Sequence, residues 1–492
     1  MIWVNEQVAS FGRSVGAAPR YLSEEHQLAW QRLRMARMLF EGRHRQFFWD
    51  EARTQFDYPI TRVGDRQCRL YLTVNLLRLV SVKTADLLFG AKAKLDAPTV
   101  PQTDALDLLA RRSKIHSRFH TAVVQASWAG GSYLLGTTYR GEGYLDNVEP
   151  DDIYPLGQRG PDDQYERYVR YATANIGTEQ SPLIVLLETN YEPGRIARKL
   201  YQLQGDKRQK ELNLDQWPHW SAAQGGVPAN DVRTGVGDNV ITYIPNECGG
   251  NLGLSDYDGI IEVQDTVNAK FAQVARVLMK HSDPKLAMPE TAADEKGNVR
   301  ADHDLFFFRT KDEMPTYITW SAELSAAMQD REAAIDAFCV ASEMSQIILG
   351  IKKGAAPVAA RTLRLEATNS LAKAGRKAPN IEPAIARAVE IAQRLDQTTA
   401  LRRSYPVDPI GVEMRDGLPV DELDVAQTVS TYRAAGVMSV EDAVERRKED
   451  PDSAFTEVQR IKAEQAASAP PIFGPFTEQP EETPPATEPA AA

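Results

Sequence analysis

The feature that most constrains this chain is a pair of long helical stretches separated by a short insertion. Apolar residues recur at spacings of three and four between Ile260 and Leu278, which predicts an amphipathic helix within residues 251–281, roughly 40 Å long at 1.5 Å per residue. A second long helix is predicted over residues 321–348. Residues 282–320 contain three prolines and strand-like runs, which interrupt the helical pattern. The central predicted unit is therefore a helix, a small β-containing insertion and a second helix.

The apolar stripes of the two helices predict that they pack against each other. The residues predicted to make this contact follow helical spacing on each helix: Val263, Val267, Phe271, Val274, Leu324, Ile335 and Phe338. Leu278 and Met328 continue the same stripes and are predicted to face inward as well. In the insertion, the strand-like runs are Leu305–Phe308 and Tyr317–Trp320.

Acidic residues gather where the first of these helices should begin. Ser255 is a predicted N-cap, and Asp258 follows three residues later as in a capping box. The acids from Asp256 to Asp265 allow two interpretations, a metal-binding cluster or carboxylates placed at the positive end of the helix dipole. The basic residues of the helix come last, as the dipole favours, so we adopt the second interpretation.

The residues before this unit divide into helices and a β region. Helices are predicted over residues 24–41, 74–89 and 104–128. From Ser132 to Tyr243 the pattern changes to short β-rich runs separated by turn residues, which predicts antiparallel strands. The predicted strands are Tyr133–Tyr139, Tyr165–Ala172, Leu183–Thr189, Arg195–Leu203 and Val240–Ile244.

The residues after the second long helix begin with a glycine-bounded loop that contains Lys352 and Lys353. Helix is predicted again from Val358, with a break at Gly375 and Pro379. The remaining predicted elements are a helix over Ile381–Leu395, a strand at Ile410–Met414, and helices over Val420–Ala434, Ser439–Lys448 and Phe455–Ala467. The tail, residues 468–492, holds seven prolines and neither lysine nor arginine, so we expect it to be disordered.

Composition limits the classes of protein to which the chain can belong. The 492 residues are 42% hydrophobic and 25% charged, as in folded soluble proteins. The net charge of −11 argues against a basic nucleic-acid coat. Three cysteines are too few for a disulfide framework or a zinc site, which favours synthesis in a reducing cytoplasm. The chain shows neither a signal peptide nor a membrane-spanning run, so no membrane partner is expected.

Motifs that resemble catalytic sites are better explained without catalysis. Gly12–Gly16 matches G-x-S-x-G around Ser14, but too few residues precede it for the buried strand that a nucleophile elbow requires. His116 and His120 stand four apart on a predicted helix, yet Ser117 takes the place of the glutamate of the zincin pattern. The loop with the two lysines lacks the Walker order. We therefore predict no enzyme activity, no cofactor and no metal site.

The order of elements resembles the SPP1-type family of tailed-bacteriophage portal proteins, over roughly residues 20–465. The residues that carry this resemblance are short and spread along the chain: Val74–Val80, Leu87–Gly90, Val148–Pro155 as a "V-x-P-x-x-I" strand, Ile244–Asn246, Leu254–Tyr257, Val267–Asn268, Gly417–Pro419 and Gly436–Ser439.

The resemblance implies a mixed α/β (α+β) portal fold whose subunits form a ring. It implies the following regions: N-terminal helices and a β-rich wing (1–250), a first stem helix (251–281), a clip (282–320), a second stem helix (321–348), a tunnel loop (349–357), wing helices and a strand (358–419), a helical crown (420–467) and the tail (468–492). The seven stem residues would then also pack against neighbouring copies.

The function implied by the resemblance is mechanical. A ring of twelve subunits would sit at one capsid vertex of the virion and form the channel for double-stranded DNA during packaging and ejection. Its expected partners are the large terminase subunit, head–tail adaptors, and capsid and scaffold proteins, with Lys352 and Lys353 facing the DNA. The alternatives are another virion structural protein, such as a baseplate or scaffold component, and an α/β hydrolase that uses Ser14.

Overall fold

The computed structural model describes residues 17–48, 60–63, 66–69, 71–178, 180–217, 230–247, 249, 252–281, 286–289, 305–308, 321–351, 360–399, 404–418, 422–447 and 457–464. The chain divides into two units, Met1–Pro419 and Val420–Ala492, with separate apolar cores. Helices and antiparallel sheets occur together, so the mixed fold class is confirmed. Among the described residues, we find no helix with the length and apolar character needed to cross a bilayer.

A group of helices opens the first unit: α2 (Glu24–Phe40), α3 (His44–Phe48), α4 (Leu76–Phe89), α5 (Val100–Ser113) and α6 (Ile115–Ala129). Side chains cap two of these helices at their N-termini. Ser23 Oγ accepts from the N–H of His26 at 3.3 Å at the start of α2, and Asn75 caps α4 in the same way. The single helix predicted over residues 104–128 is wrong. Lys114, with a φ of 50°, turns the chain there, and α5 and α6 pack against each other.

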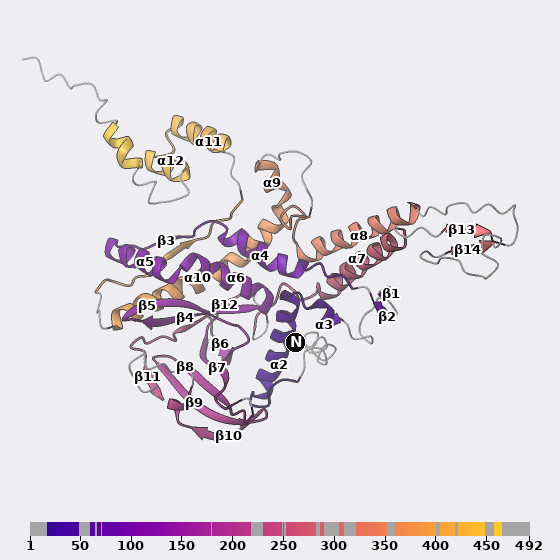
Figure 1. Ribbon diagram of the computed structural model, residues 1–492. Coiled ribbons are helices and arrows are strands. Elements are labelled where there is room, and N and C mark those ends of the chain that lie inside the picture. The colour runs from indigo at the N-terminus through magenta and orange to yellow at the C-terminus, as the bar shows by residue number, and fades with distance from the viewer. Residues whose placement is uncertain are drawn as a thin grey trace, which may run out of the picture. The chain divides into compact units, whose positions relative to one another are not determined.

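A sheet of order β12-β4-β5 lies at the centre of this unit, with β4 (Gly131–Tyr139), β5 (Glu142–Val148) and β12 (Ile241–Pro245). Helices α6 and α10 (Thr368–Thr398) pack on it (Figure 1). Leu134 and Leu145 of the sheet share a core with Phe119 of α6 and Ile385 of α10. The sheet and these two helices are therefore packed together around one apolar core.

A larger antiparallel sheet follows in the order β10-β9-β8-β7-β6, with β11 paired to β9. Its elements are β6 (Ile153–Arg159), β7 (Tyr165–Asn175), β8 (Ile184–Glu192), β9 (Arg195–Gln204), β10 (Lys207–Leu212), the 3-10 turn η1 (Leu214–Gln216) and β11 (Asp231–Arg233). The predicted antiparallel region is thus confirmed. Val148–Pro155, however, is not one strand, because Val148 ends β5, Ile153 begins β6, and a turn through Pro150 joins them.

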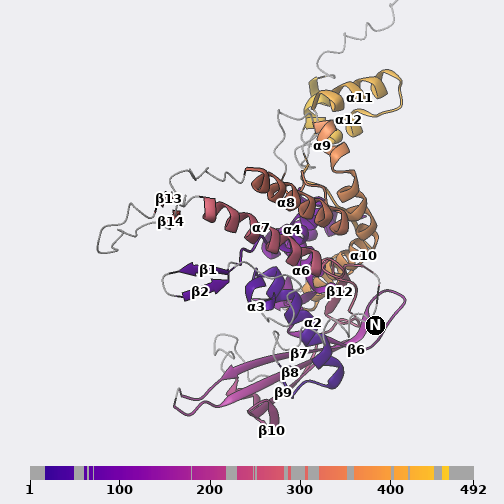
Figure 2. The ribbon, with the colours of Figure 1, turned by 90° about the vertical axis from the view of Figure 1, so that its right-hand side faces the viewer.

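The two long helices are α7 (Ile261–His281) and α8 (Ser321–Ser342), and they lie side by side in both views (Figures 1 and 2). Both are shorter than predicted. Residues 252–260 form turns before α7. Glu343, with a φ of 57°, ends α8 six residues before the predicted end, and turns continue to Gly350.

Helices α7 and α8 contact each other within the chain, and the residues predicted for their packing are buried to different degrees. Val267, Val274, Ile335 and Phe338 are buried, and Val263, Phe271 and Leu324 are partly buried. The prediction was wrong for two residues, since Leu278 is 44% exposed and Met328 37% exposed.

Helix α10 contradicts the predicted break, because it runs without interruption through Gly375, Pro379 and Pro383. Each interior proline removes a helical hydrogen bond and costs ~3 kcal/mol. Burial of a large aliphatic side chain stabilises by ~1.5–3 kcal/mol, and α10 buries several on one face. These are Ile381, Ile385, Val389, Ile391 and Leu395. Their combined burial outweighs the proline cost, so tertiary packing keeps the helix continuous. The short helix α9 (Ala360–Glu366) precedes it.

Small strand pairs complete the described part of the first unit. The strands are β1 (Ile60–Val63), β2 (Arg66–Arg69), β3 (Lys94–Asp96), β13 (Leu286–Pro289), β14 (Leu305–Phe308) and β15 (Gly411–Glu413). β13 pairs with β14 in parallel, within the predicted insertion, which confirms the strand at Leu305–Phe308. Tyr317–Trp320 lies outside the described residues. β15 pairs with β3 and confirms the strand predicted at Ile410–Met414.

The second unit is helical, as predicted. It contains α11 (Glu422–Ala434), α12 (Val440–Arg447) and helical residues 457–464. Its small core joins Val444 and Val458, with Val440 and Ile461 packed against them. Ser439 Oγ accepts from the N–H of Asp442 at 3.0 Å and caps α12. The tail predicted to be disordered, residues 468–492, lies outside the described residues.

Candidate functional site: the junction of α7, α8 and α10

The sequence-predicted site residues do not come together in one place. Lys352, Lys353 and Ser14 lie outside the described residues. His116 and His120 both lie on α6, and His120 Nε2 contacts Asp86 Oδ1 at 3.0 Å. No group of three or more potential metal ligands occurs among the described residues.

The acids before α7 do not follow the helix-dipole interpretation. Glu262 is the acid in the first turn of α7, while Asp256 and Asp258 precede the helix. Asp258 Oδ2 accepts from the N–H of Ser255 at 3.0 Å, which is half of the predicted capping box. Ser255 Oγ, however, accepts from the N–H of Tyr257, so it caps a turn and not the helix. Asp256 instead enters a buried network.

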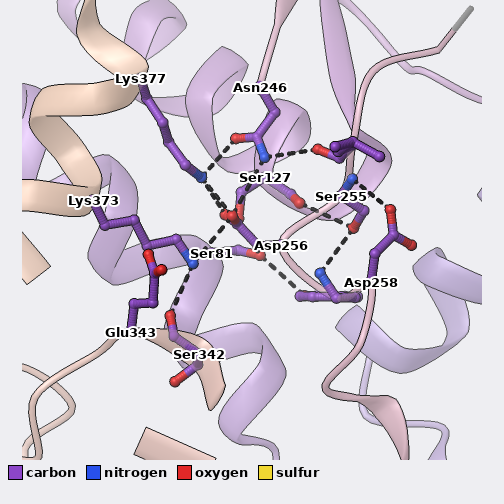
Figure 3. A network of polar contacts seen from close by, with 12 residues as sticks. Ser81, Ser127, Asn246, Ser255, Asp256, Asp258, Ser342, Glu343, Lys373 and Lys377 are labelled. Carbon is purple, nitrogen blue, oxygen red and sulfur yellow. Dashed lines mark hydrogen bonds and ion pairs between the residues drawn. The ribbon is translucent and has the colours of Figure 1, made fainter. Parts of the chain in front are cut away.

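Asp256 is the centre of this network, and it is paired with α10 (Figure 3). Lys377 Nζ lies 2.6 Å from both carboxylate oxygens of Asp256 and 2.8 Å from Asn246 Oδ1. The side chain of Lys377 is 0% exposed and that of Asp256 is 2% exposed. These three acceptor contacts match the three N–H donors of the Lys377 ammonium. The pair is therefore a fully desolvated, hydrogen-bonded ion pair.

Lys373, one turn earlier on α10, extends the network to the end of α8. Its Nζ lies 3.2 Å from Asp256 Oδ1 and donates to the backbone carbonyl of Ser342 at 2.9 Å (Figure 3). Ser342 is the last residue of α8. One lysine thus bridges the turn before α7 and the C-terminus of α8. We call the set Asp256, Ser342, Lys373 and Lys377 the α7–α8 junction.

Hydroxyl groups from α4 and α6 complete the surroundings of Asp256. Ser127 Oγ donates its proton to Asp256 Oδ2 at 2.5 Å and lies 3.0 Å from Ser81 Oγ. Ser81 Oγ in turn donates to Tyr257 Oη at 3.0 Å. Each of these buried hydroxyl groups has a polar partner, so their burial carries little penalty for unmade hydrogen bonds.

The electrostatics of the junction keep Asp256 charged. Burial by itself raises the pKa of the Asp256 carboxyl, but the charges of Lys377 and Lys373 outweigh it and hold that pKa well below its usual range. Burial also lowers the pKa of Lys377, and the Asp256 carboxylate opposes that shift. The cluster therefore holds two lysines against one buried carboxylate.

A second, uncharged network fixes α7 one turn further along. Gln264 and Asn268 are fully buried on α7. Gln264 Nε2 donates to the carbonyl of Val74 at 2.7 Å, and Asn268 Oδ1 accepts from the N–H of the same residue at 3.1 Å. Asn268 Nδ2 contacts His44 Nδ1 at 3.1 Å, and burial lowers the pKa of His44 to about 4. A neutral imidazole can accept this bond, so the start of α7 is held to α3 and to the approach of α4.

Comparison with known proteins identifies the family of the chain. The family described as "Phage portal protein, SPP1 Gp6-like" matches residues 20–471, which include the whole junction. The chain belongs to this portal protein family. No curated protein matches the chain.

Solved structures with a similar chain have low sequence identity. A chain of "Virion of native gene transfer agent (GTA) particle" has 14% identity and a TM-score of 0.41, over 89% of this portal chain and 97% of that chain. A chain of "Neck of native GTA particle computed with C12 symmetry" has 14% identity and a TM-score of 0.33, over 75% of this chain and 88% of that chain. A chain of "Neck of empty GTA particle computed with C6 symmetry" has 12% identity and a TM-score of 0.32, over 74% of this chain and 86% of that chain.

Membership of the portal family makes the chain a structural protein of a phage-like virion. At the α7–α8 junction, buried ion pairs and hydrogen bonds join α10 to the turn before α7 and to the last residue of α8. Sequence reasoning missed it. A signal was present, because Lys373 and Lys377 stand four apart, and Lys377 stands four before Ile381 on the inward face of a helix. The break predicted at Gly375 and Pro379 concealed that shared face.

Proposed function

We propose that this portal protein forms a ring of twelve identical subunits at one capsid vertex, through which double-stranded DNA enters and leaves the virion. The observation that carries the proposal is the family match over residues 20–471. In this proposal α7 and α8 are the two stem helices, residues 282–320 the clip, residues 349–357 the tunnel loop, and residues 420–467 the crown. The β-rich residues before α7 and the helices after Pro357 form the wing. The ring works mechanically and catalyses no reaction.

The net charge of −11 suits a channel through which DNA must slide. Duplex DNA carries one negative charge per about 1.7 Å, so a strongly basic wall would hold it. A mildly repulsive wall with few cations at the constriction lets DNA pass. Lys352 and Lys353 are our candidates for those cations. The large terminase subunit, head–tail adaptors, and capsid and scaffold proteins are the proposed partners of the ring.

Imaging of the purified protein by electron microscopy tests the proposal. A ring with a central hole as wide as a DNA duplex is the expected result. A compact monomer, or an assembly without a hole, would favour a baseplate or scaffold protein. Labelling with a serine-directed probe tests the hydrolase alternative, and covalent modification of Ser14 would be required to revive it.

The two lysines have a separate test. Replacement of both Lys352 and Lys353 by alanine should leave folding and rings unchanged, because exposed charges contribute ~0–1 kcal/mol to stability. DNA contacts of this kind are electrostatic and independent of sequence. We therefore expect shorter packaged DNA per particle, with the largest difference from the wild type at low salt, because raised salt screens the wild-type contacts as well. Wild-type DNA length at every salt concentration would remove these lysines from the mechanism.

A further inference from the structure

We propose that Lys373 is a positioning residue, which fixes residues 343–351 and thereby the segment that leads directly to Lys352 and Lys353. The inference rests on the proposed function, in which those two lysines face DNA. Lys373 performs this role by holding the last carbonyl of α8 and the carboxylate of Asp256 at the same time.

The contacts between α10 and the end of α8 surround Lys373. The N–H of Ser345 donates to Ser370 Oγ at 2.9 Å, three residues before Lys373 on α10. Arg376, three residues after it, pairs with Glu343. That outer pair is about half exposed, and pairs of this kind contribute little. Lys373 is only 6% exposed, so the buried centre of this contact is its ammonium group.

The charge count shows that Lys373 is not needed to neutralise Asp256. Lys377 alone contacts both carboxylate oxygens at 2.6 Å. The second lysine is therefore surplus to that ion pair, and its shortest contact is with Ser342 at the end of α8. A helix C-terminus carries about half a negative charge on its free carbonyls, which is what a buried cation can stabilise. The ammonium group of Lys373 therefore stabilises the C-terminal carbonyl of α8.

A buried ammonium group also fixes the position of its neighbours through hydrogen-bond geometry, which an apolar side chain would not do. Apolar residues of similar volume are often neutral or stabilising when they replace buried ion pairs, so stability alone does not account for a lysine here. An apolar side chain would allow α8 to shift along α10 at little cost. The ammonium requires acceptors at hydrogen-bond distance and thus selects one position for residues 342–345.

The C-terminal end of α10 has its own buried ion pair, so the helix is anchored at both ends. Asp396 Oδ1 accepts from Arg112 Nη2 at 2.8 Å and from the N–H of Gly143 at 2.8 Å. The side chain of Asp396 is 2% exposed. This pair joins α10 to α5 and β5 and is remote from α8. It supplies a matched control, because the same helix and the same kind of contact are involved.

The experiment compares Lys373→Met with the control Arg112→Met in assembled rings. Hydrogen exchange reports the position of residues 343–351, because the amides of Met344, Leu349, Gly350 and Ile351 are each bonded to a backbone carbonyl in the native structure. We expect Lys373→Met to form rings, to speed exchange of these amides about tenfold or more, and to shorten packaged DNA. Arg112→Met should speed exchange in β5 and at the end of α10, and leave residues 343–351 as in the wild type.

Wild-type exchange at residues 343–351 in Lys373→Met would overturn the inference, as would the same exchange pattern in both variants. If Lys373→Met does not assemble, Ser370→Ala removes only the bond to Ser345 and must speed the same amides for the inference to stand. A wild-type protein that forms no ring refutes the proposed function instead. Rings that package normally in every variant refute the positioning role alone.

Discussion

Replacement of Asp256 by asparagine tests the buried charge of the junction with little change in side-chain volume. The wild-type carboxylate accepts hydrogen bonds from Lys377 and Ser127 and forms an ion pair with Lys373. An asparagine removes the charge and turns an amide NH2 toward these donors. Breaking a buried ion pair by removal of one partner costs ~3–5 kcal/mol, since the other charge remains buried and unpaired. We expect a loss in the free energy of unfolding within that range for Asp256→Asn.

The matched control is Asp330→Asn, which removes the same charge from an exposed pair. Asp330 Oδ2 lies 2.5 Å from Lys270 Nζ, but the Asp330 side chain is 50% exposed. Exposed pairs contribute ~0.2–1 kcal/mol. The difference in burial should therefore separate the free energies of unfolding of the two variants by ~2–5 kcal/mol, although both aspartates have a lysine partner.

Denaturant unfolding followed by tryptophan fluorescence measures this difference. Trp128 is a suitable reporter, because it is buried and its carbonyl accepts from Ser255 Oγ at 2.8 Å, next to Asp256. The midpoint for Asp256→Asn should fall while the slope m stays constant. A free energy of unfolding within ~1 kcal/mol of that of Asp330→Asn would refute the assignment of Asp256 as a stabilised buried anion.

Further predictions follow from the same contacts. The pKa of Asp256 is lower in the folded chain than in the unfolded chain, so the unfolded state takes up a proton first as the pH falls. The free energy of unfolding should therefore decrease as the pH drops below about 4–5. In a pH series of unfolding curves, Asp256→Asn should lack this part of the acid dependence. Val267→Asp should prevent ring formation, because Val267 is 0% exposed and the new carboxylate would be buried without a partner; normal rings by electron microscopy would contradict this. Phe271→Asp should be milder, since the Arg331 guanidinium lies 5.5 Å from the Phe271 ring centre and is available to pair with the new charge, and its unfolding midpoint should exceed that of Val267→Asp. A chain truncated after Ala467 should still form rings, because residues 468–492 hold few apolar anchors, and failure to assemble would disprove it.

The sequence alone predicted the long helices and the order of elements, because these depend on local periodicity. The stripe through Val267 and Val274 located α7, and Phe338 located α8. Turn residues marked the antiparallel region in the same way. The short motifs then allowed the portal family to be recognised before any contact was known.

Tertiary structure decided where the local signals were weak or opposed. Pro379 predicted a break that the buried face of α10 overrides, since the packing of several aliphatic side chains exceeds the local proline cost. Asp256 looked like a helix-dipole acid, and only the fold brings Lys377 to it from 121 residues away. Whether a charge is solvated or buried depends on which distant segments surround it. Local sequence contains no measure of that burial, and for this reason the junction became visible only in three dimensions.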